Sequence, residues 1–541
     1  MIWRKISYAD LEKPLSNERE MNLMRAFFGV TVGVAAVLAI AAQPNASQAS
    51  ESTRSESTPG DRPNVILIYA DDLGFGDLSC YGSATVATPN IDRLATEGIR
   101  FTDAHCAAAT CTPSRYAMLT GVYAWRKKGT GIAPGNAALI IDPDTVTLPS
   151  IFQQAGYKSS VIGKWHLGLG TGNLDWNEKI SPGPLELGFN ECFLVPATGD
   201  RVPTVYVENH HVFGLDSADP LNVSYGQPLG EEPTGAKSPE LLRQKLSHGH
   251  DNTIHNGISR IGYMSGGIAA RWVDEDMADT LTKRACDFMT RQAGSQQPFF
   301  LFFSLHDIHV PRTPHARFVG QTSMGPRGDV IAQADWCVGE VLNQLETLGI
   351  AKNSLVLFSS DNGPVLDDGY RDEAVEKLGA HDPAGGLRGG KYSAFEAGTR
   401  VPLLARWPGQ IMAGQTSPAL ISQVDFCADF ASIFGITLRP GECLDSREYV
   451  AALLGKDDRG RSLLVEQSGT LALRDGDWKY IEPSTGPAVA KSTNIETGLS
   501  ESPQLYDLES DLGERKNLAA QFPKKVAELK ELLKKIGNEG K

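Results

Sequence analysis

Apolar residues along this chain fall into short continuous runs separated by stretches of helical periodicity. A run that is apolar throughout is typical of a strand buried on both faces of a sheet. Such runs span residues 64–70, 159–162, 298–304, 355–358 and 401–405. Amphipathic helical spacing is found over residues 91–97, 148–155, 277–291 and 331–348. This alternation predicts an α/β fold in which a large, mostly parallel central sheet lies between layers of helices.

Two parts of the chain depart from the alternation. Residues 196–270 are rich in Gly, Pro and His and have little periodicity, and a long irregular insert in a compact domain is often functional. After a helical pattern over 425–434 the elements become shorter. They are strands at 478–481 and 505–508 and an amphipathic helix at 524–536. We therefore predict a main domain over 62–440 and a smaller α+β subdomain with an antiparallel sheet over 441–541.

The N-terminal region has the pattern of an export signal. Arg25 precedes an apolar run over 26–42, and the polar segment that follows ends with Ser47 and Ala49. A positive charge, a short apolar run and a small-x-small ending characterise a cleaved signal peptide. We predict a signal region over 1–49, with Met21 as an alternative start, followed by a linker over 50–61. The apolar run is only just shorter than a spanning helix, so an uncleaved membrane anchor is the alternative.

Charge and cysteine content narrow the function classes. The chain of 541 residues has a formal charge of −14. It therefore lacks the excess of basic residues that is typical of a nucleic-acid-binding protein. If its substrate is anionic, basic side chains must be concentrated in the site itself. Eight cysteines in a chain of this length do not make a disulfide scaffold, no two have metal-finger spacing, and their pairing cannot be deduced from sequence.

Acidic residues follow two of the predicted strands. Asp71 and Asp72 come directly after the first strand, and Asp361 and Asn362 directly after the strand at 355–358. Adjacent carboxylates repel each other unless a cation binds between them. Asp-Asn-Gly alone is more typical of a turn, but with Asp71 and Asp72 it forms an all-oxygen set that suits calcium or magnesium.

Basic side chains follow other predicted strands. Lys164 and His166 follow the strand at 159–162, and at this spacing in extended chain they point the same way. Lysine can neutralise an anion, while histidine transfers protons near neutral pH. His306 and His309 follow the strand at 298–304, and Lys391 follows two glycines that permit close backbone approach.

One cysteine lies in a distinctive local context. Cys111 opens the sequence Cys-Thr-Pro-Ser-Arg, which ends at Arg115. Pro113 is suited to the first turn of a helix, so Cys111 is expected near a helix N-terminus, where N–H groups face a bound anion. A buried structural cysteine beside an ordinary helix start is the alternative interpretation.

Together these motifs resemble the type I, formylglycine-dependent sulfatases of the alkaline phosphatase superfamily. Residues 111–115 match the Cys-x-Pro-x-Arg signature of that family, in which a separate formylglycine-generating enzyme oxidises the cysteine to formylglycine. Residues 156–166 match the second signature, and further landmarks extend from residue 62 to about 518. The resemblance implies an alkaline-phosphatase-like layered fold and hydrolysis of sulfate esters.

The resemblance also implies a role for each matching residue. One calcium ion would be bound by Asp71, Asp72, Asp361, Asn362 and the modified Cys111. Arg115 and Lys164 would hold the formylglycine hydrate, with His166 as its base. Lys164, His309 and Lys391 would bind sulfate, and His309 or Lys391 would protonate the leaving oxygen. The two hydroxyls of an aldehyde hydrate would let one attack sulfur while the other remains to expel sulfate.

Alternatives remain for the activity and the substrate. A phosphatase or phosphodiesterase of the same superfamily is the second hypothesis, although such enzymes keep a Ser or Thr nucleophile. An inactive, glycan-binding relative is the third. Export, an acidic surface and the long insert favour a sulfated carbohydrate substrate and a periplasmic or extracellular location, with no nucleic-acid partner and no stable membrane insertion after cleavage. The candidate sugar contacts are His306, Arg201, His250, Arg260 and Trp272.

Overall fold

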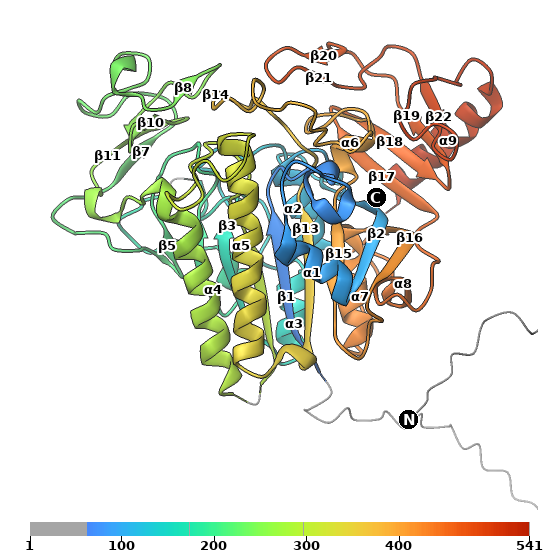
Figure 1. The fold of residues 1–541 in the computed structure, drawn as a ribbon, viewed down its shortest axis with the longest axis horizontal. Helices are drawn as coiled ribbons and strands as arrows, with labels where there is room; N and C mark the ends of the chain where they lie inside the picture. Colours follow the sequence, from blue (N-terminus) through green and yellow to red (C-terminus); the bar gives the residue numbers. More distant parts are fainter. Residues whose placement is uncertain (1–61, 173, 296, 540–541) are drawn as a thin grey trace, which may run out of the picture. The chain divides into compact units, whose positions relative to one another are not determined.

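A ten-stranded sheet runs through the described part of this computed structural model, which comprises residues 62–172, 174–295 and 297–539 (Figure 1). In spatial order its strands are β16 (Gln415–Ser422), β2 (Ile99–His105), β15 (Leu403–Arg406), β13 (Ser354–Ser360), β1 (Asn64–Ala70), β12 (Phe299–Ser304), β3 (Lys158–Lys164), β4 (Glu191–Val195), β5 (Val207–Glu208) and β6 (His211–Val212). The central strands β13, β1, β12, β3 and β4 are parallel, whereas β15 is antiparallel to both its neighbours. The predicted α/β fold with a mostly parallel sheet is confirmed.

Helices cover both faces of this sheet. Figure 1 shows α4 and α5 side by side in front of the strands, with α2 and α3 behind them. The main helices are α1 (Pro89–Glu97), α2 (Cys111–Thr120), α3 (Leu148–Gln154), α4 (Met277–Ala293), α5 (Pro326–Thr347) and α7 (Phe426–Ile433). The short helices are α6 (Glu396–Thr399) and α8 (Val450–Leu453).

Strand β1 shows why a continuous apolar run forms the centre of the sheet. Its side chains alternate between two cores: Val65 and Leu67 pack with Phe152 on one face, and Ile66 and Ile68 pack with residues of α4 and α5 on the other. Burial of one such side chain stabilises the fold by about 1.5–3 kcal/mol. A strand between two helical layers therefore needs apolar residues at every position.

Strands β2 and β16, toward one edge of the sheet, carry a different pattern and were not predicted. β2 has partly exposed polar residues, among them Arg100, Thr102 and Asp103, so it lacks the continuous apolar run. β16 pairs in parallel with β2, with a break in register between Ser417 and Leu420. The apolar pattern therefore misses β2, which is only partly covered, and also the short β4, although both of its faces are buried.

The insert at 196–270 adopts local pairings of short strands. These are β7 (Asn222–Ser224), β8 (Lys245–Leu246), β9 (Ile254–His255), β10 (Ile258–Ser259) and β11 (Tyr263–Ser265). β8 pairs with β14 (Tyr370–Arg371), which belongs to the segment after β13. This pairing brings the insert to the edge of the sheet where β13 ends, which is also the edge where Asp361 and Asn362 lie.

The C-terminal part contains a smaller antiparallel sheet, as predicted. Its order is β17 (Leu463–Ser468), β18 (Thr470–Asp475), β19 (Trp478–Ile481) and β22 (Gln504–Asp507), and α9 (Pro523–Asn538) packs against it. A separate hairpin pairs β20 (Val489–Ala490) with β21 (Ile495–Glu496). The domain boundary near residue 440 stays a prediction.

Buried charges join the smaller sheet to the main one. Lys479 of β19 contacts Glu396 of α6 at 2.9 Å, Glu466 of β17 at 3.1 Å and Glu514 at 3.5 Å. His105 of β2 also contacts Glu466, at 2.8 Å. Removing one member of such a network leaves the others buried without compensation, so the junction depends on all of them.

The predicted signal region 1–49 and linker 50–61 lie outside the described residues. Among the helices that the structure describes, we find none with the length and apolar character needed to cross a bilayer. A cleaved signal peptide and an uncleaved membrane anchor therefore both remain predictions from the sequence.

Candidate active site

The proposed chemistry-bearing residues meet at the carboxyl edge of the central parallel strands. β1 ends at Ala70, β13 at Ser360 and β3 at Lys164, so the next residues of all three leave the sheet at the same edge. Loops at this edge are where ligands bind in open α/β sheets. The structure thereby brings together Asp71, Asp72, Cys111, Arg115, Lys164, His166, His309, Asp361, Asn362 and Lys391.

Three carboxylates and one amide form the acidic centre of this site. Asn362 donates through Nδ2 to Asp72 Oδ1 at 2.7 Å, and the backbone N–H of Asp72 donates to Asp361 Oδ1 at 3.3 Å. Two oxygens, Oδ1 of Asp71 and Oδ1 of Asn362, are buried without a hydrogen-bond partner. Burial, followed by the nearby Asp361 charge, raises the pKa of Asp71 well above its ordinary value. These oxygens could therefore hold a hard divalent cation.

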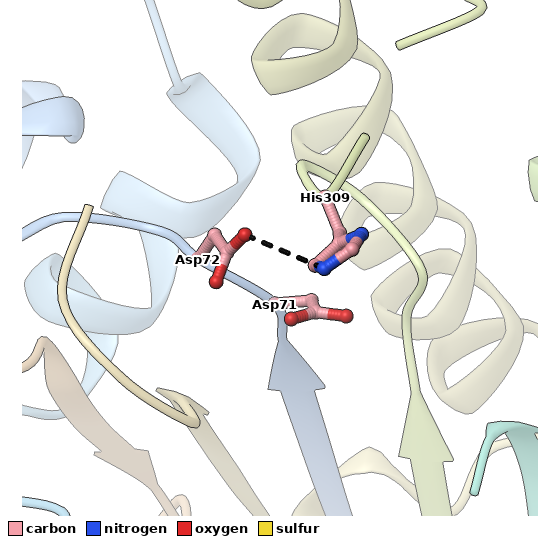
Figure 2. A group of neighbouring side chains, drawn as sticks. All are labelled: Asp71, Asp72 and His309. Atoms are coloured by element: carbon pink, nitrogen blue, oxygen red, sulfur yellow. Dashed lines mark ion pairs between the residues drawn. The ribbon is translucent and has the colours of Figure 1, made fainter. Parts of the chain in front are cut away.

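His309 lies next to the same carboxylates. Its Nε2 is 3.8 Å from Asp72 Oδ2, and one atom each of Asp71, Asp72 and His309 lie within 4.8 Å of one another (Figure 2). Its other ring nitrogen, Nδ1, lies 2.7 Å from the carbonyl oxygen of Val310, to which a protonated Nδ1 would donate. Burial, followed by Lys391 and Lys164, lowers the pKa of His309 well below its ordinary value. The geometry alone therefore allows His309 either to contact a cation or to face a bound anion.

Arg115 and Lys164 compensate the acidic centre from the side of α2 and β3. Arg115 donates through Nε to Asp361 Oδ2 at 2.8 Å and through Nη1 to Ser304 Oγ at 2.6 Å. Lys164 donates to Asp71 Oδ2. Burial on its own would raise the pKa of Asp361, but Arg115 and Lys164 outweigh it and lower that pKa. Asp361 is consequently a carboxylate at neutral pH.

Lys391 approaches the site from the opposite side. Its ammonium group donates to Asp72 Oδ2 at 2.9 Å and to Asp368 Oδ2 at 2.8 Å, and the hydroxyl of Tyr392 is 3.2 Å from both oxygens of Asp368. Gly390 passes close to the backbone of Pro364, where an added β-carbon would meet its carbonyl oxygen at 2.5 Å. This close approach explains the glycine before Lys391.

Cys111 is the first residue of α2, after the N-cap residue Thr110. Its Sγ lies 3.2 Å from Nδ1 of His166, and Nε2 of His166 lies 2.9 Å from the carbonyl oxygen of Ala133. Burial raises the pKa of the Cys111 thiol despite the opposing influence of Lys164 and Lys391. The unmodified side chain is therefore a neutral thiol at neutral pH, which is a weak nucleophile.

Arg201 and His250, two of the candidate sugar contacts, both contact the carboxylate of Asp200, which lies at the rim of the site. Arg201 donates to Asp200 Oδ2 at 2.8 Å, and Nε2 of His250 lies 2.9 Å from the same oxygen. Burial alone would lower the pKa of His250, but its hydrogen bond to Asp200 raises it. The backbone N–H of Gly199, next to Asp200, donates to His306, whose ring lies 5.7 Å from that of His309, so this cluster borders the candidate site.

The remaining candidates are buried within the insert and its supports. Arg260 is fully buried and donates through Nη2 to both carboxylate oxygens of Asp274, at 2.7 and 2.8 Å. Trp272 is also buried and donates to Asp274 at 3.1 Å. His306 accepts at Nε2 from the backbone N–H of Gly199 at 2.9 Å. These contacts hold the insert against the sheet.

Three residues of the site were not identified from the sequence: Asp200, Asp368 and Tyr392. Asp368 lies seven residues beyond Asp361, in a segment without periodicity. Only the return of that loop toward Lys391 brings its carboxylate into the site. A weak signal existed in the pair Asp367-Asp368, which resembles the Asp71-Asp72 pair but does not follow a strand directly.

Comparisons with known proteins decide the family. A Sulfatase family model matches residues 63–436. An N-acetylgalactosamine-6-O-sulfatase of Bacteroides thetaiotaomicron is 51% identical over 478 residues, which cover 88% of this chain and 93% of the relative. The chain belongs to the sulfatase family. It is a sulfuric ester hydrolase. Human arylsulfatase A is 30% identical over 494 residues, which cover 88% of this chain and 87% of that protein.

Solved structures agree with this assignment. A structure from work on the metabolism of multiple glycosaminoglycans by Bacteroides thetaiotaomicron matches this sulfatase with a TM-score of 0.87 at 50% identity, covering 88% of this chain and 100% of that chain. A phosphonate monoester hydrolase of Agrobacterium radiobacter matches with a TM-score of 0.54 at 17% identity, covering 88% and 95%. The second match shows the fold alone, which is alkaline-phosphatase-like.

Proposed function

We propose that this sulfatase hydrolyses the 6-O-sulfate of N-acetylgalactosamine in a sulfated carbohydrate. The site offers a neutral residue 111 next to a histidine and three buried basic side chains, a set suited to holding and transferring a sulfuryl group. The identity of 51% to an N-acetylgalactosamine-6-O-sulfatase supports the choice of sugar and position. We further propose that the protein is exported to the periplasm or the cell exterior, as its N-terminal pattern suggests.

The catalytic group would be formylglycine, formed from Cys111 by a formylglycine-generating enzyme. Its hydrate supplies two hydroxyls on one carbon, one to attack sulfur and one to expel sulfate afterwards. His166, whose Nε2 is turned toward the carbonyl oxygen of Ala133, is free at Nδ1 to take a proton from the side chain of residue 111. Arg115 and Lys164 orient that side chain, and His309 or Lys391 delivers a proton to the departing sugar oxygen.

The residues at the acidic centre fit one calcium ion. The two unpartnered oxygens of Asp71 and Asn362 are hard ligands, and Asp72 and Asp361 add carboxylates beside them. We propose these four residues and modified residue 111 as the ligands. When bound, a divalent cation would polarise the sulfate oxygens and offset negative charge in the transferred group. Lys164 and Lys391 are the chain's own basic side chains that would lie beside the transferred sulfuryl group.

The sugar would be bound by the rim of the site. Arg201 donates to Asp200 through Nη1, so its other guanidinium N–H groups can donate to sugar hydroxyls. His250 orients Asp200, because its two ring nitrogens face Asp200 Oδ2 and the carbonyl oxygen of His248, at 2.9 and 3.1 Å. His306 is the third candidate, because its ring lies 5.7 Å from that of His309. We propose that Arg260 and Trp272 support this arrangement by holding the insert in place.

The proposal is tested with defined monosaccharides. We expect sulfate release from N-acetylgalactosamine 6-sulfate and little from the 4-sulfate, measured by ion chromatography. Cys111→Ala is the inactive control because it cannot form the aldehyde. Mass spectrometry of the tryptic peptide 101–115 should show Cys106 alkylated and residue 111 converted. Equal turnover of both isomers would overturn the positional assignment, and two alkylated cysteines in a fully active preparation would overturn the formylglycine assignment.

A further inference from the structure

Two cysteines meet at the end of the helix that carries Cys111. Cys427 lies on α7, and Cys443 lies in the loop that follows it; their exposed fractions are 0% and 4%. A β-carbon added to Gly121, the residue that ends α2, would lie 2.7 Å from Cβ of Cys443 and 3.1 Å from Cβ of Cys427. Both side chains therefore leave the backbone next to the same glycine, within reach of each other.

The thiol of Cys427 faces the end of α2, where it donates to the carbonyl oxygens of Leu119 and Met118 at 3.6 and 3.9 Å. Burial, followed by the hydrogen bond and charge of the Cys443 thiol, raises the pKa of Cys427 well above its ordinary value. All eight cysteines lie within the described residues and are free thiols there. Other buried thiols face different residues: Cys106 faces the carbonyl oxygens of Ala108 and Thr399, Cys111 faces His166, and Cys192 faces the carbonyl oxygen of Asn209. Cys427 and Cys443 are the pair whose β-carbons adjoin the same glycine.

We propose that Cys427 and Cys443 form a disulfide bond when the protein folds in an oxidising compartment, a step that rests on the proposed export. The oxidant is a protein or small-molecule disulfide. The thiolate of one cysteine attacks a sulfur of that disulfide, which gives a mixed disulfide and releases one thiol. The second cysteine then attacks the first, forms the S–S bond and releases the second thiol. Two electrons and two protons pass to the oxidant, and the reaction occurs during folding because the folded thiols are closed to solvent.

The bond would brace the C-terminal end of α2. The N–H of Gly121 donates to the carbonyl oxygen of Ala117, and the N–H of Asp445 donates to the carbonyl oxygen of Gly121. The carboxylate of Asp445 in turn accepts from the N–H of Tyr123 at 2.8 Å and from Arg126 at 2.7 Å. Linking Cys443 to α7 would fix this loop.

The test is the thiol state of the exported protein. Trypsin leaves both cysteines in one peptide, residues 407–447, because Pro440 follows Arg439. We expect this peptide to lack two hydrogens and to resist alkylation until it is reduced, and cleavage before Asp429 should give two chains held by the bond. Alkylation of both cysteines without reduction, or pairing of either with another cysteine, would overturn the proposal.

A second measurement tests the bracing. A disulfide that closes a loop of about 15 residues stabilises a protein by restricting its unfolded chain. We therefore expect reductant to lower the melting temperature of the exported protein by about 3 °C. The doubly substituted Cys427→Ser, Cys443→Ser protein should show no such shift, whereas the control Cys337→Ser, at a buried cysteine on α5, should keep it. Equal responses of wild type and double variant would overturn the bracing role. Sulfate release by the same preparations separates this outcome from failure of the proposed function.

Discussion

Sγ of Cys111 lies 3.2 Å from Nδ1 of His166, while Nε2 of the same ring lies 2.9 Å from the carbonyl oxygen of Ala133. A carbonyl oxygen only accepts, so Nε2 carries the proton and Nδ1 is the acceptor that faces residue 111. Burial, followed by Lys164, lowers the pKa of His166 well below its ordinary value. The imidazole is therefore neutral, which is the state that a base at residue 111 requires.

We predict that His166→Asn lowers turnover by about 10²–10⁴-fold, because the group that removes a proton at residue 111 is lost. Asparagine is chosen since His166 has a φ of 56°, a conformation that asparagine tolerates well. Conversion of Cys111, followed by mass spectrometry of peptide 101–115, should equal that of wild type. Wild-type turnover in the converted variant would contradict the role of His166 as base.

We predict that Asp361→Asn abolishes measurable turnover and lowers the bound calcium, because it removes a charged ligand while preserving side-chain shape. The loss of one carboxylate also leaves Arg115, at 2.7 Å from Asp361, without its partner, so the melting temperature should fall as well. Elemental analysis of the purified proteins measures the metal. Asp458→Asn, at an exposed aspartate remote from the strand ends, is the control. Full activity of wild type after chelation to a metal-free state would show that the site needs no cation.

The sequence predicted the central strands and singled out most of the candidate site residues for one physical reason. β1, β12 and β13 are buried on both faces, so their apolar runs are continuous, and the polar residues that follow stand out. Asp368 was missed because a loop return brings it to Lys391, and Asp200 was missed because only the path of the insert brings His250 to it. Loop paths depend on tertiary contacts such as the pairing of β8 with β14, which no local pattern reveals.

The junction between the two sheets escaped prediction for a related reason. Lys479 and Glu514 each look like surface residues in the sequence, and long-range packing buries them both completely. A buried charge is tolerated only when its partners come with it. Glu396 and Glu514 reach Lys479 from distant parts of the chain, whereas Glu466 lies two strands away in the same sheet. Sequence spacing carries no information on such a meeting.

This junction yields a prediction on pH and stability. Burial, opposed by Lys479 and assisted by Glu396, raises the pKa of Glu514 from 4.5 to about 8. The folded protein thus holds this proton more tightly than the unfolded chain, and the resulting stability is complete below pH 4.5 and is lost as pH rises through about 8. Glu514→Gln should therefore show a flatter melting temperature across this window than wild type. Glu509→Gln, at an exposed position, should follow wild type. Parallel curves for wild type and Glu514→Gln would contradict the prediction.

The last prediction concerns which residue protonates the departing sugar oxygen. A sugar alkoxide is a poor leaving group and needs a proton in the transition state, whereas a nitrophenolate can leave without one. Asp368 and Asp72 overcome the effect of burial and raise the pKa of Lys391 well above its ordinary value, so its ammonium group releases a proton reluctantly. His309, whose pKa burial lowers, gives up a proton readily once a bound sulfate has favoured its protonated form.

We therefore expect His309→Ala to reduce hydrolysis of the sugar sulfate about 10²-fold more than hydrolysis of nitrophenyl sulfate. Lys391→Ala should reduce both alike, because the transferred group is the same. Initial rates on the two substrates, with each variant shown to carry the converted residue 111, give the ratio. A selective loss in Lys391→Ala and a uniform loss in His309→Ala would reverse the assignment.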